Sequence, residues 1–176
     1  MNPKKILLIP FNGIDEEVLE KISAYLSKSF KKEVVTGGNS SLSPGAYNSS
    51  RKQFHSSKLL DNLISRQSRE YERILGIADV DLYVPELNFV FGEADPSEGV
   101  AIISLIRLRQ EFYRRPQDKI LFIGRAVKEA VHELGHTYGL GHCRNVKCVM
   151  HFSNSLMDTD IKEKNFCSGC QGKLKR

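Results

Sequence analysis

One short segment of the chain gathers side chains of the types that bind a metal ion and move a proton. Residues 132–136 read His-Glu-Leu-Gly-His, and the chain continues through two further glycines to His142. Residues four apart on a helix share one face, with Cβ atoms about 5–6 Å apart, so His132 and His136 can offer two imidazoles to one ion. The glycines allow the chain to leave the helix and turn, which would bring His142 back as a third nitrogen ligand.

This spacing predicts hydrolytic chemistry at a zinc ion. Three protein ligands leave one coordination position for water, as in catalytic zinc sites, whereas structural sites are closed. Glu133 directly follows the first candidate ligand, and its carboxylate could take a proton from that water and return it to a leaving amine. The same ion would polarise a carbonyl oxygen, so these groups together would form an amide hydrolase. Ordinary helical histidines and a zinc site with an idle glutamate are the alternatives.

All the cysteines of the chain follow the histidine motif. Cys143 and Cys148 form one close pair, and Cys167 and Cys170 form a Cys-x-x-Cys. Two close thiolate pairs are a common way to build a closed tetrahedral zinc site that contributes to folding. Reduced buried cysteines, a redox Cys-x-x-Cys and a disulfide pair are the alternatives. Because His142 and Cys143 are adjacent, a zinc site here would hold the turn that presents the third histidine.

The elements that must position these residues can be predicted from the spacing of apolar side chains. Residues 6–9 predict a short buried strand that ends at Pro10. Asp15 can cap a helix that runs to residue 30, because apolar residues recur there at three- and four-residue steps. A second strand is predicted at 33–36. This β-α-β order favours parallel pairing of the two strands.

The histidine motif is predicted to lie at the end of a long helix that begins at Asp118.

Between the second strand and this helix, one loop, one helix and several strands are predicted. Residues 37–58 are rich in Gly, Ser, Asn and Pro, which predicts one long loop. Pro85 predicts an edge strand somewhere between residues 80 and 92. A second amphipathic helix is predicted at 59–64, and strands are predicted at 74–77, 80–84, 87–91 and 99–106.

The composition is that of a globular protein with room for one compact domain. The chain has 176 residues, of which 40% are hydrophobic and 27% charged, which excludes collagen-like, low-complexity and fully disordered chains. No apolar run approaches the roughly 20 residues that a membrane helix needs, so we expect no membrane association. The N-terminus lacks the apolar core of a secretory signal, which predicts a cytoplasmic location. Disulfides are disfavoured in that compartment.

The motif region as a whole resembles the archaemetzincins, a branch of the metzincin zinc peptidases. Residues 132–170 contain His-Glu-x-x-His-x-x-Gly-x-x-His, which continues directly into Cys-x4-Cys-x-Met and a later Cys-x-x-Cys. Ala-Tyr-Asn at 46–48, Arg-Lys-Gln-Phe at 51–54 and the segment 124–130 also resemble that family. One departure is Phe152, which stands where some metzincins carry a tyrosine near the metal.

The resemblance implies a role for each position of the motif. Glu133 would be the general base and acid, and Met150 would be the methionine of a turn beneath the metal. Two zinc ions per chain are implied, one catalytic and one structural. The catalytic zinc would be bound by His132, His136 and His142, and the structural zinc by Cys143, Cys148, Cys167 and Cys170.

The resemblance also implies an α/β architecture with a mixed, mostly parallel sheet, an antiparallel edge strand, an active-site helix and a small zinc-stabilised C-terminal part. The edge strand would align an extended peptide, and residues 87–91 or their neighbours are the candidate. We expect residues 1–176 to form a single metallopeptidase domain. Within it, residues 1–142 would hold the sheet and the active-site helix, and 143–176 would form a small subdomain around the cysteines.

The sequence thus predicts a cytoplasmic, monomeric zinc-dependent peptidase that acts on peptides or protein segments. The alternative is a non-catalytic module that keeps the fold and binds zinc or nucleic acid. The net charge of +5 and the sequence pI of about 9.0 motivate that alternative. No block of five like charges occurs, however, so we do not expect a nucleic-acid partner.

Overall fold

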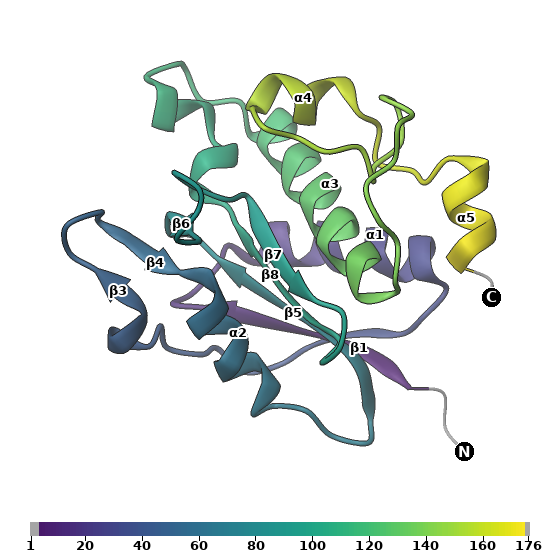
Figure 1. The fold of residues 1–176 in the computed structure, drawn as a ribbon, viewed down its shortest axis with the longest axis horizontal. Helices are drawn as coiled ribbons and strands as arrows, with labels where there is room; N and C mark the ends of the chain where they lie inside the picture. Colours follow the sequence, from purple (N-terminus) through teal and green to yellow (C-terminus); the bar gives the residue numbers. More distant parts are fainter. Residues whose placement is uncertain (1–3, 175–176) are drawn as a thin grey trace.

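A computed structural model describes residues 4–174 of the chain (Figure 1). A five-stranded sheet with the order β2-β1-β5-β8-β7 forms its centre. The first four of these strands run parallel, and β7 pairs with β8 in the antiparallel sense. The strands are β1 (Lys5–Phe11), β2 (Val34–Thr36), β5 (Tyr71–Ala78), β7 (Gly92–Asp95) and β8 (Val100–Ser104). The predicted mixed, mostly parallel sheet with an antiparallel edge strand is therefore confirmed.

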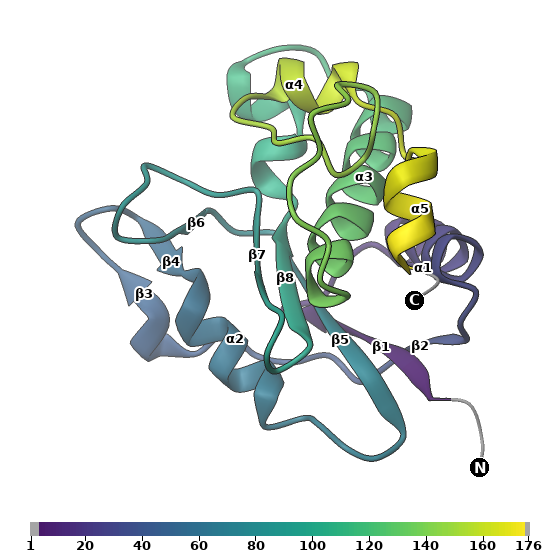
Figure 2. The ribbon, with the colours of Figure 1, turned by 45° about the vertical axis from the view of Figure 1, so that its right-hand side comes forward.

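Helices cover both faces of the sheet, as Figures 1 and 2 show. α1 (Glu16–Phe30) and α3 (Lys119–Thr137) lie on one face, and α2 (Ser56–Ile64) lies on the other. Strand β1 separates two apolar clusters, because successive side chains of a strand point to opposite faces. Ile6 and Leu8 pack toward α1 and α3, whereas Leu7 and Ile9 pack toward α2.

Both long helices begin where the sequence predicts. The Asp15 carboxylate accepts a hydrogen bond of 2.9 Å from the backbone N–H of Glu17. The Asp118 carboxylate accepts one of 2.9 Å from the backbone N–H of Leu121. Each bond satisfies a backbone donor that the first turn of a helix leaves free. The long helix that carries the histidine motif is thus fixed at its N-terminal end by a local sequence signal.

Strand β1 continues past Pro10, contrary to the prediction that the proline ends it. The Pro10 carbonyl accepts a hydrogen bond of 2.8 Å from the Ser40 backbone, on the side where β2 has already ended at Thr36. The N–H and C=O of one strand residue point to the same edge, so the missing N–H of Pro10 also faces that side. Because β2 does not extend there, the proline removes no β1–β2 hydrogen bond.

The prediction of one long loop over residues 37–58 is wrong. The segment contains a short η1 turn (Pro44–Ala46), strands β3 (Tyr47–Asn48) and β4 (Gln53–His55), and the start of α2. β3 and β4 form a small second sheet with β6 (Leu82–Tyr83). Side chains hold this sheet, since Gln53 Nε2 donates to Asp81 Oδ2 at 3.1 Å and to the Asn88 carbonyl at 2.8 Å. The turn-forming composition does not reveal these long-range bonds.

The antiparallel edge strand lies just after its first candidate segment. Within residues 87–91 the backbone forms a single bridge, in which the Val90 N–H donates to the Leu82 carbonyl at 2.9 Å. The strand itself is β7, which begins at Gly92. Alternating apolar residues at 87–91 therefore mark one wall of a cavity rather than the paired strand.

The C-terminal part packs along the motif helix. It contains α4 (Leu156–Ile161) and α5 (Ser168–Leu174). Elsewhere in the chain, two short turns, η2 (Ile106–Leu108) and η3 (Gln110–Tyr113), precede α3. The buried Arg125 of α3 makes two hydrogen bonds of 2.7 Å to the Asp160 carboxylate. The proposed division of the chain at residue 142 stays a prediction. Within residues 4–174, no helix combines the length and apolar character needed to cross a membrane.

Candidate metal centres and active site

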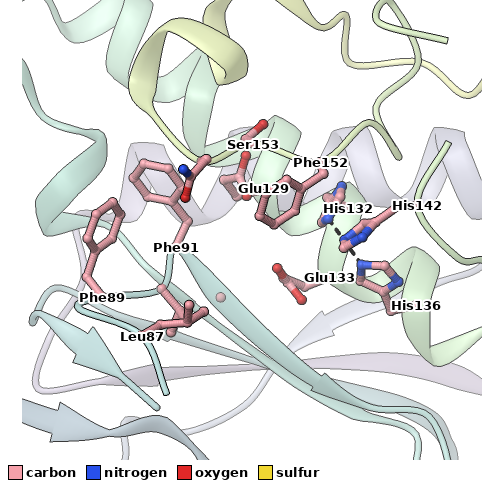
Figure 3. Close-up of a pocket in the computed structure, with 13 residues that line it drawn as sticks. Leu87, Phe89, Phe91, Glu129, His132, Glu133, His136, His142, Phe152 and Ser153 are labelled. Atoms are coloured by element: carbon pink, nitrogen blue, oxygen red, sulfur yellow. Dashed lines mark hydrogen bonds between the residues drawn. The ribbon is translucent and has the colours of Figure 1, made fainter. Parts of the chain in front are cut away.

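Three imidazoles converge at the end of α3. His132 and His136 lie one turn apart on this helix, which ends at Thr137. Gly139 then adopts a φ of +82°, a conformation that side chains disfavour, and the chain turns so that His142 faces the helix. One nitrogen from each of the three rings lies within 4.8 Å of the others. Figure 3 shows the rings pointing toward one another, as the spacing predicts.

Hydrogen bonds to carbonyl groups fix two of the rings in one tautomer. Nδ1 of His132 lies 2.8 Å from the Val149 carbonyl oxygen, and Nδ1 of His136 lies 2.7 Å from that of Leu140. A carbonyl oxygen can only accept, so each Nδ1 must carry the proton and donate. In the neutral rings each Nε2 therefore keeps a free lone pair, which is the form that binds a metal.

The geometry of these lone pairs fits one shared cation. Nε2 of His132 and Nε2 of His136 lie 3.1 Å apart, although neither of them carries a proton in the neutral rings. Burial lowers the pKa of His132 and of His136, so the rings are neutral and do not hydrogen-bond to each other. Two nitrogens bound to a tetrahedral zinc at 2.0–2.1 Å would be about 3.3 Å apart. The donor set thus matches zinc in type and in spacing.

Glu133 is buried beside the histidines. Burial is the main reason that its pKa is raised to about 8, and the neighbouring Glu129 raises it further. At neutral pH this environment favours the protonated acid, and only a nearby positive charge would favour the carboxylate. A cation among the three imidazoles would be such a charge. Figure 3 shows the Glu133 carboxyl directed away from the helix, next to the histidine cluster.

Gly92 of the edge strand makes room for Glu133. A Cβ atom at this position would lie 2.5 Å from Glu133 Cγ and 2.7 Å from the backbone oxygen of Ile102. Such contacts are shorter than real Cβ atoms tolerate, so the strand and the helix can approach this closely only at a glycine. Sequence reasoning missed this residue because its role depends on Glu133, which lies 41 positions later in the chain.

Substitution of Gly92 by alanine should impair the site more than the fold. We expect about 1–3 kcal/mol of destabilisation from overpacking and a loss of about 100-fold in kcat/KM, because Glu133 would be displaced. Unfolding curves and peptide hydrolysis would measure the two effects. Gly124→Ala is the matched control, since a Cβ there meets nothing within 4 Å. Activity equal to that of Gly124→Ala would contradict the role of Gly92.

Met150 packs against the helix that carries His132 and His136, and its role as the methionine of a turn beneath the metal stays a prediction. It is fully buried, and its Sδ occupies the space that a side chain on Gly135 would fill, 2.5 Å from the ideal Cβ position. The preceding residue, Val149, supplies the carbonyl that orients His132. The turn around Met150 therefore supports the first candidate ligand through a hydrogen bond and packs against the helix at Gly135.

The four cysteines form a second cluster. The sulfur atoms of Cys143, Cys148, Cys167 and Cys170 all lie within 4.8 Å of one another. The Cys143 and Cys167 sulfurs are 3.8 Å apart, far beyond a disulfide bond of about 2.05 Å. Four thiolates around zinc at about 2.3 Å would have sulfur separations of about 3.8 Å. The cluster therefore has the dimensions of a closed tetrahedral thiolate site.

One thiol of this cluster is readily ionised. A hydrogen bond from the backbone of Cys170 is the main reason that the pKa of Cys167 is lowered to about 7. Burial instead raises the pKa of Cys148 and of Cys170. Without a cation, burial therefore favours the thiol form of Cys148 and Cys170, and a bound metal would be needed to stabilise both as thiolates.

Hydrogen bonds hold Cys143 against the turn around Met150. The Cys143 N–H donates to the Met150 carbonyl at 2.8 Å, and Nδ1 of His151 donates to the Cys143 carbonyl at 2.8 Å. Cys143 also follows His142 directly in the chain. The position of the third candidate ligand thus depends on the conformation of the cysteine cluster.

A cavity of about 200 Å³ adjoins the histidines. Sequence reasoning missed four of its lining residues, Gly92, Ser153, Asn154 and the buried Glu129, which lies three positions before His132 on the same helix. The helical i, i+3 spacing could have indicated Glu129. No sequence signal indicates Ser153 or the buried Lys162. The lining residues are Leu87, Phe89, Val90, Phe91, Gly92, Glu129, His132, Glu133, His136, His142, Phe152, Ser153 and Asn154.

The chain is similar to known proteins over nearly its full length. Residues 6–176 match the profile of peptidase family M54. An archaemetzincin from Pyrococcus furiosus is 42% identical over 175 residues, which cover 96% of this chain and 91% of that protein. The crystal structure of an archaemetzincin from Methanopyrus kandleri matches with a TM-score of 0.87 and 37% identity, covering 100% of this chain and 98% of the other. That of a zinc-dependent peptidase from Methanocorpusculum labreanum matches with a TM-score of 0.88 and 31% identity, over 96% and 99%.

The fold, the histidine cluster and these similarities together define a zinc metallopeptidase. The mixed sheet, the motif helix and the C-terminal part all fall within the matched region. The chain belongs to peptidase family M54, in which its relatives are archaemetzincins.

Proposed function

We propose that this protein hydrolyses peptide bonds, with a zinc ion held by His132, His136 and His142 and with Glu133 as the general base and acid. The observation that carries the proposal is the pair of imidazoles whose tautomers are fixed by backbone carbonyls. Their Nε2 atoms, each with a free lone pair, lie 3.1 Å apart. The buried carboxyl of Glu133 lies beside them. Peptides or protein segments are the proposed substrates, which is consistent with membership of a peptidase family.

The side chains of this chain would position and transfer protons. Bound zinc would supply Lewis-acid chemistry, because it lowers the pKa of a water ligand and polarises a carbonyl oxygen. A carboxylate oxygen of Glu133 would accept a proton from the attacking water and deliver it to the nitrogen of the leaving amine. The carbonyls of Val149 and Leu140 would hold His132 and His136 in the metal-binding tautomer throughout.

The edge strand would align the substrate next to these groups. β7 is the last strand of the main sheet, so its outer edge has no strand partner within residues 4–174. An extended peptide can add to such an edge by backbone hydrogen bonds. Gly92 brings this strand against Glu133. A peptide bound along β7 would therefore pass the proposed general base.

We further propose that Cys143, Cys148, Cys167 and Cys170 hold a second, structural zinc. The proposal is supported by the 3.8 Å separation of two of the sulfurs and by the four free thiols. Free thiols in this arrangement are typical of a reducing compartment, which also supports the predicted cytoplasmic location.

A peptide mixture derived from a whole proteome would test the function directly. Zinc-loaded protein should cleave a subset of these peptides, whereas protein treated with a chelator should not, and added zinc should restore cleavage. Mass spectrometry of the new peptide ends would record the cleavage sites. A zinc-loaded, folded protein that produces no new ends after prolonged incubation would refute peptide hydrolysis.

A further inference from the structure

The cavity beside the histidines has apolar walls. Leu87, Phe89 and Phe91 line one side, and Phe152 lines another (Figure 3). The rings of Phe89 and Phe91 pack edge to face with centroids 5.2 Å apart. The volume of about 200 Å³ exceeds the roughly 150 Å³ of engineered cavities that hold a benzene molecule. The walls and the size therefore suit one aromatic ring.

A buried ion pair adjoins this cavity through one of its two members. Glu129 lines the cavity, and its Oε1 lies 2.9 Å from Nζ of Lys162, with side-chain exposures of 3% and 0%. The Thr159 hydroxyl also donates to Oε1, at 3.4 Å. Both of these contacts are made by Oε1, and within residues 4–174 no hydrogen bond to Oε2 of Glu129 is present. One carboxylate oxygen is thus occupied and the other is free to accept a hydrogen bond.

Ser153 contributes a second polar group without a partner. Its hydroxyl oxygen is buried and makes no hydrogen bond to any residue in the described part of the chain. The side chain lines the same cavity as Glu129. Buried polar groups are nearly always paired in folded proteins, so the Ser153 hydroxyl is available to bond to a water molecule or to a group bound in the cavity.

The charge balance decides which kind of group fits. Lys162 already neutralises Glu129, since the two side chains form a contact pair removed from solvent. A lysine or arginine side chain in the cavity would add an uncompensated buried positive charge, which is costly. A carboxylate from the substrate would instead be repelled by the negatively charged Glu129 carboxylate. A neutral hydrogen-bond donor satisfies the free oxygen of Glu129 without either penalty.

We propose that this cavity selects a tyrosine side chain of the substrate, with Glu129 and Ser153 as its specificity-determining residues. The ring would pack between Phe91 and Phe152, and the phenol O–H would donate to the free Glu129 oxygen or bond to the Ser153 hydroxyl. Phenylalanine would fill the same space but leave both polar groups unpaired. The inference rests on the proposed peptidase function and adds a substrate class to it.

Matched peptides that differ at one position would test the selection. The series carries tyrosine, phenylalanine, O-methyltyrosine or lysine next to the bond that is cleaved, in otherwise identical sequences. Zinc-loaded protein should show a kcat/KM for tyrosine at least about tenfold above that for phenylalanine, because a buried unmade hydrogen bond is costly. O-methyltyrosine should lose the same advantage, since its oxygen cannot donate. Equal rates for tyrosine and phenylalanine, or a preference for lysine, would overturn the proposal.

Two variants assign the selection to the named residues. Ser153→Ala should reduce the ratio of tyrosine to phenylalanine severalfold, whereas Ser41→Ala, at an exposed position, should leave it unchanged. The double variant Glu129→Gln with Lys162→Met removes the buried charges together, so that neither is left unpaired, and should reduce the ratio further. An unchanged ratio in both folded variants would remove Glu129 and Ser153 from the selection.

A binding measurement separates this inference from the proposed function. Titration of the tyrosine and phenylalanine peptides into zinc-loaded Glu133→Gln protein would give two dissociation constants without turnover. If the tyrosine peptide binds about tenfold or more tightly than the phenylalanine peptide, the selection is supported. If the wild-type protein also hydrolyses neither peptide, only the peptidase proposal is refuted. Hydrolysis of both peptides with equal rates and equal affinities refutes only the selection.

Discussion

Glu133→Gln should reduce kcat/KM for peptide hydrolysis by roughly 1,000-fold while the protein keeps its zinc. General acid–base groups contribute about 10²–10⁴-fold to enzyme rates, and Glu133 is the acidic residue adjacent to the first candidate ligand. Glutamine preserves the size of a side chain that packs against Gly92, so loss of the proton-transfer group is the main change. Initial rates on a cleaved peptide and metal analysis of the same preparation would measure both quantities.

The control for this experiment is Glu98→Gln, which makes the same chemical change at an exposed position. This variant should retain the full rate. Glu133→Ala should match the glutamine variant in activity and still bind zinc through the histidines. A Glu133→Gln protein that keeps more than about a tenth of the wild-type rate would exclude Glu133 as the general base.

Cys167→Ser should lower the stability of the whole chain far more than any change at the histidines. Structural zinc contributes about 10–16 kcal/mol of binding free energy in small zinc-folded peptides, comparable with the roughly 5–15 kcal/mol of total stability of a typical domain. Cys148 and Cys170 belong to the main apolar cluster that also contains Met150. We therefore expect a fall of about 10 °C or more in Tm and the loss of one zinc per chain.

His142→Ala is the comparison for this variant, because it removes a ligand from the open site at an exposed residue. It should lose catalytic zinc and activity but keep a Tm near that of the wild type. In wild-type protein, a mild chelator should remove zinc from the open histidine site before the thiolate site, so activity should fall before stability does. A Cys167→Ser protein with unchanged Tm and unchanged zinc content would contradict a structural zinc in the cysteine cluster.

The features that could be predicted from the sequence are those with local physical causes. The two long helices begin at Asp15 and Asp118 because a capping carboxylate and the following apolar stripe lie within a few residues of each other. The candidate ligands His132 and His136 share a face because helical geometry repeats every few residues. Their spacing, with the Cys-x4-Cys-x-Met continuation, was enough to predict the family, and the comparisons confirm it.

The remainder was decided by contacts between segments that are distant in the chain. The edge strand begins at Gly92 rather than within 87–91, because its pairing depends on β8 and its close approach on Glu133. Strands β3 and β4 form in a turn-rich segment because long-range hydrogen bonds hold them. Such pairings have no signature in a local window of sequence.

The sequence by itself therefore determined the chemical groups of the candidate site, and the tertiary structure determined the cavity in which they would act. Ligand spacing on a helix is a property of neighbouring residues, so it can be predicted from the chain alone. The pairing of Glu129 with Lys162, 33 positions later, depends on how α4 and the segment after it pack against α3. Burial of a charge is a property of the assembled fold, and only that fold could indicate what the cavity would select.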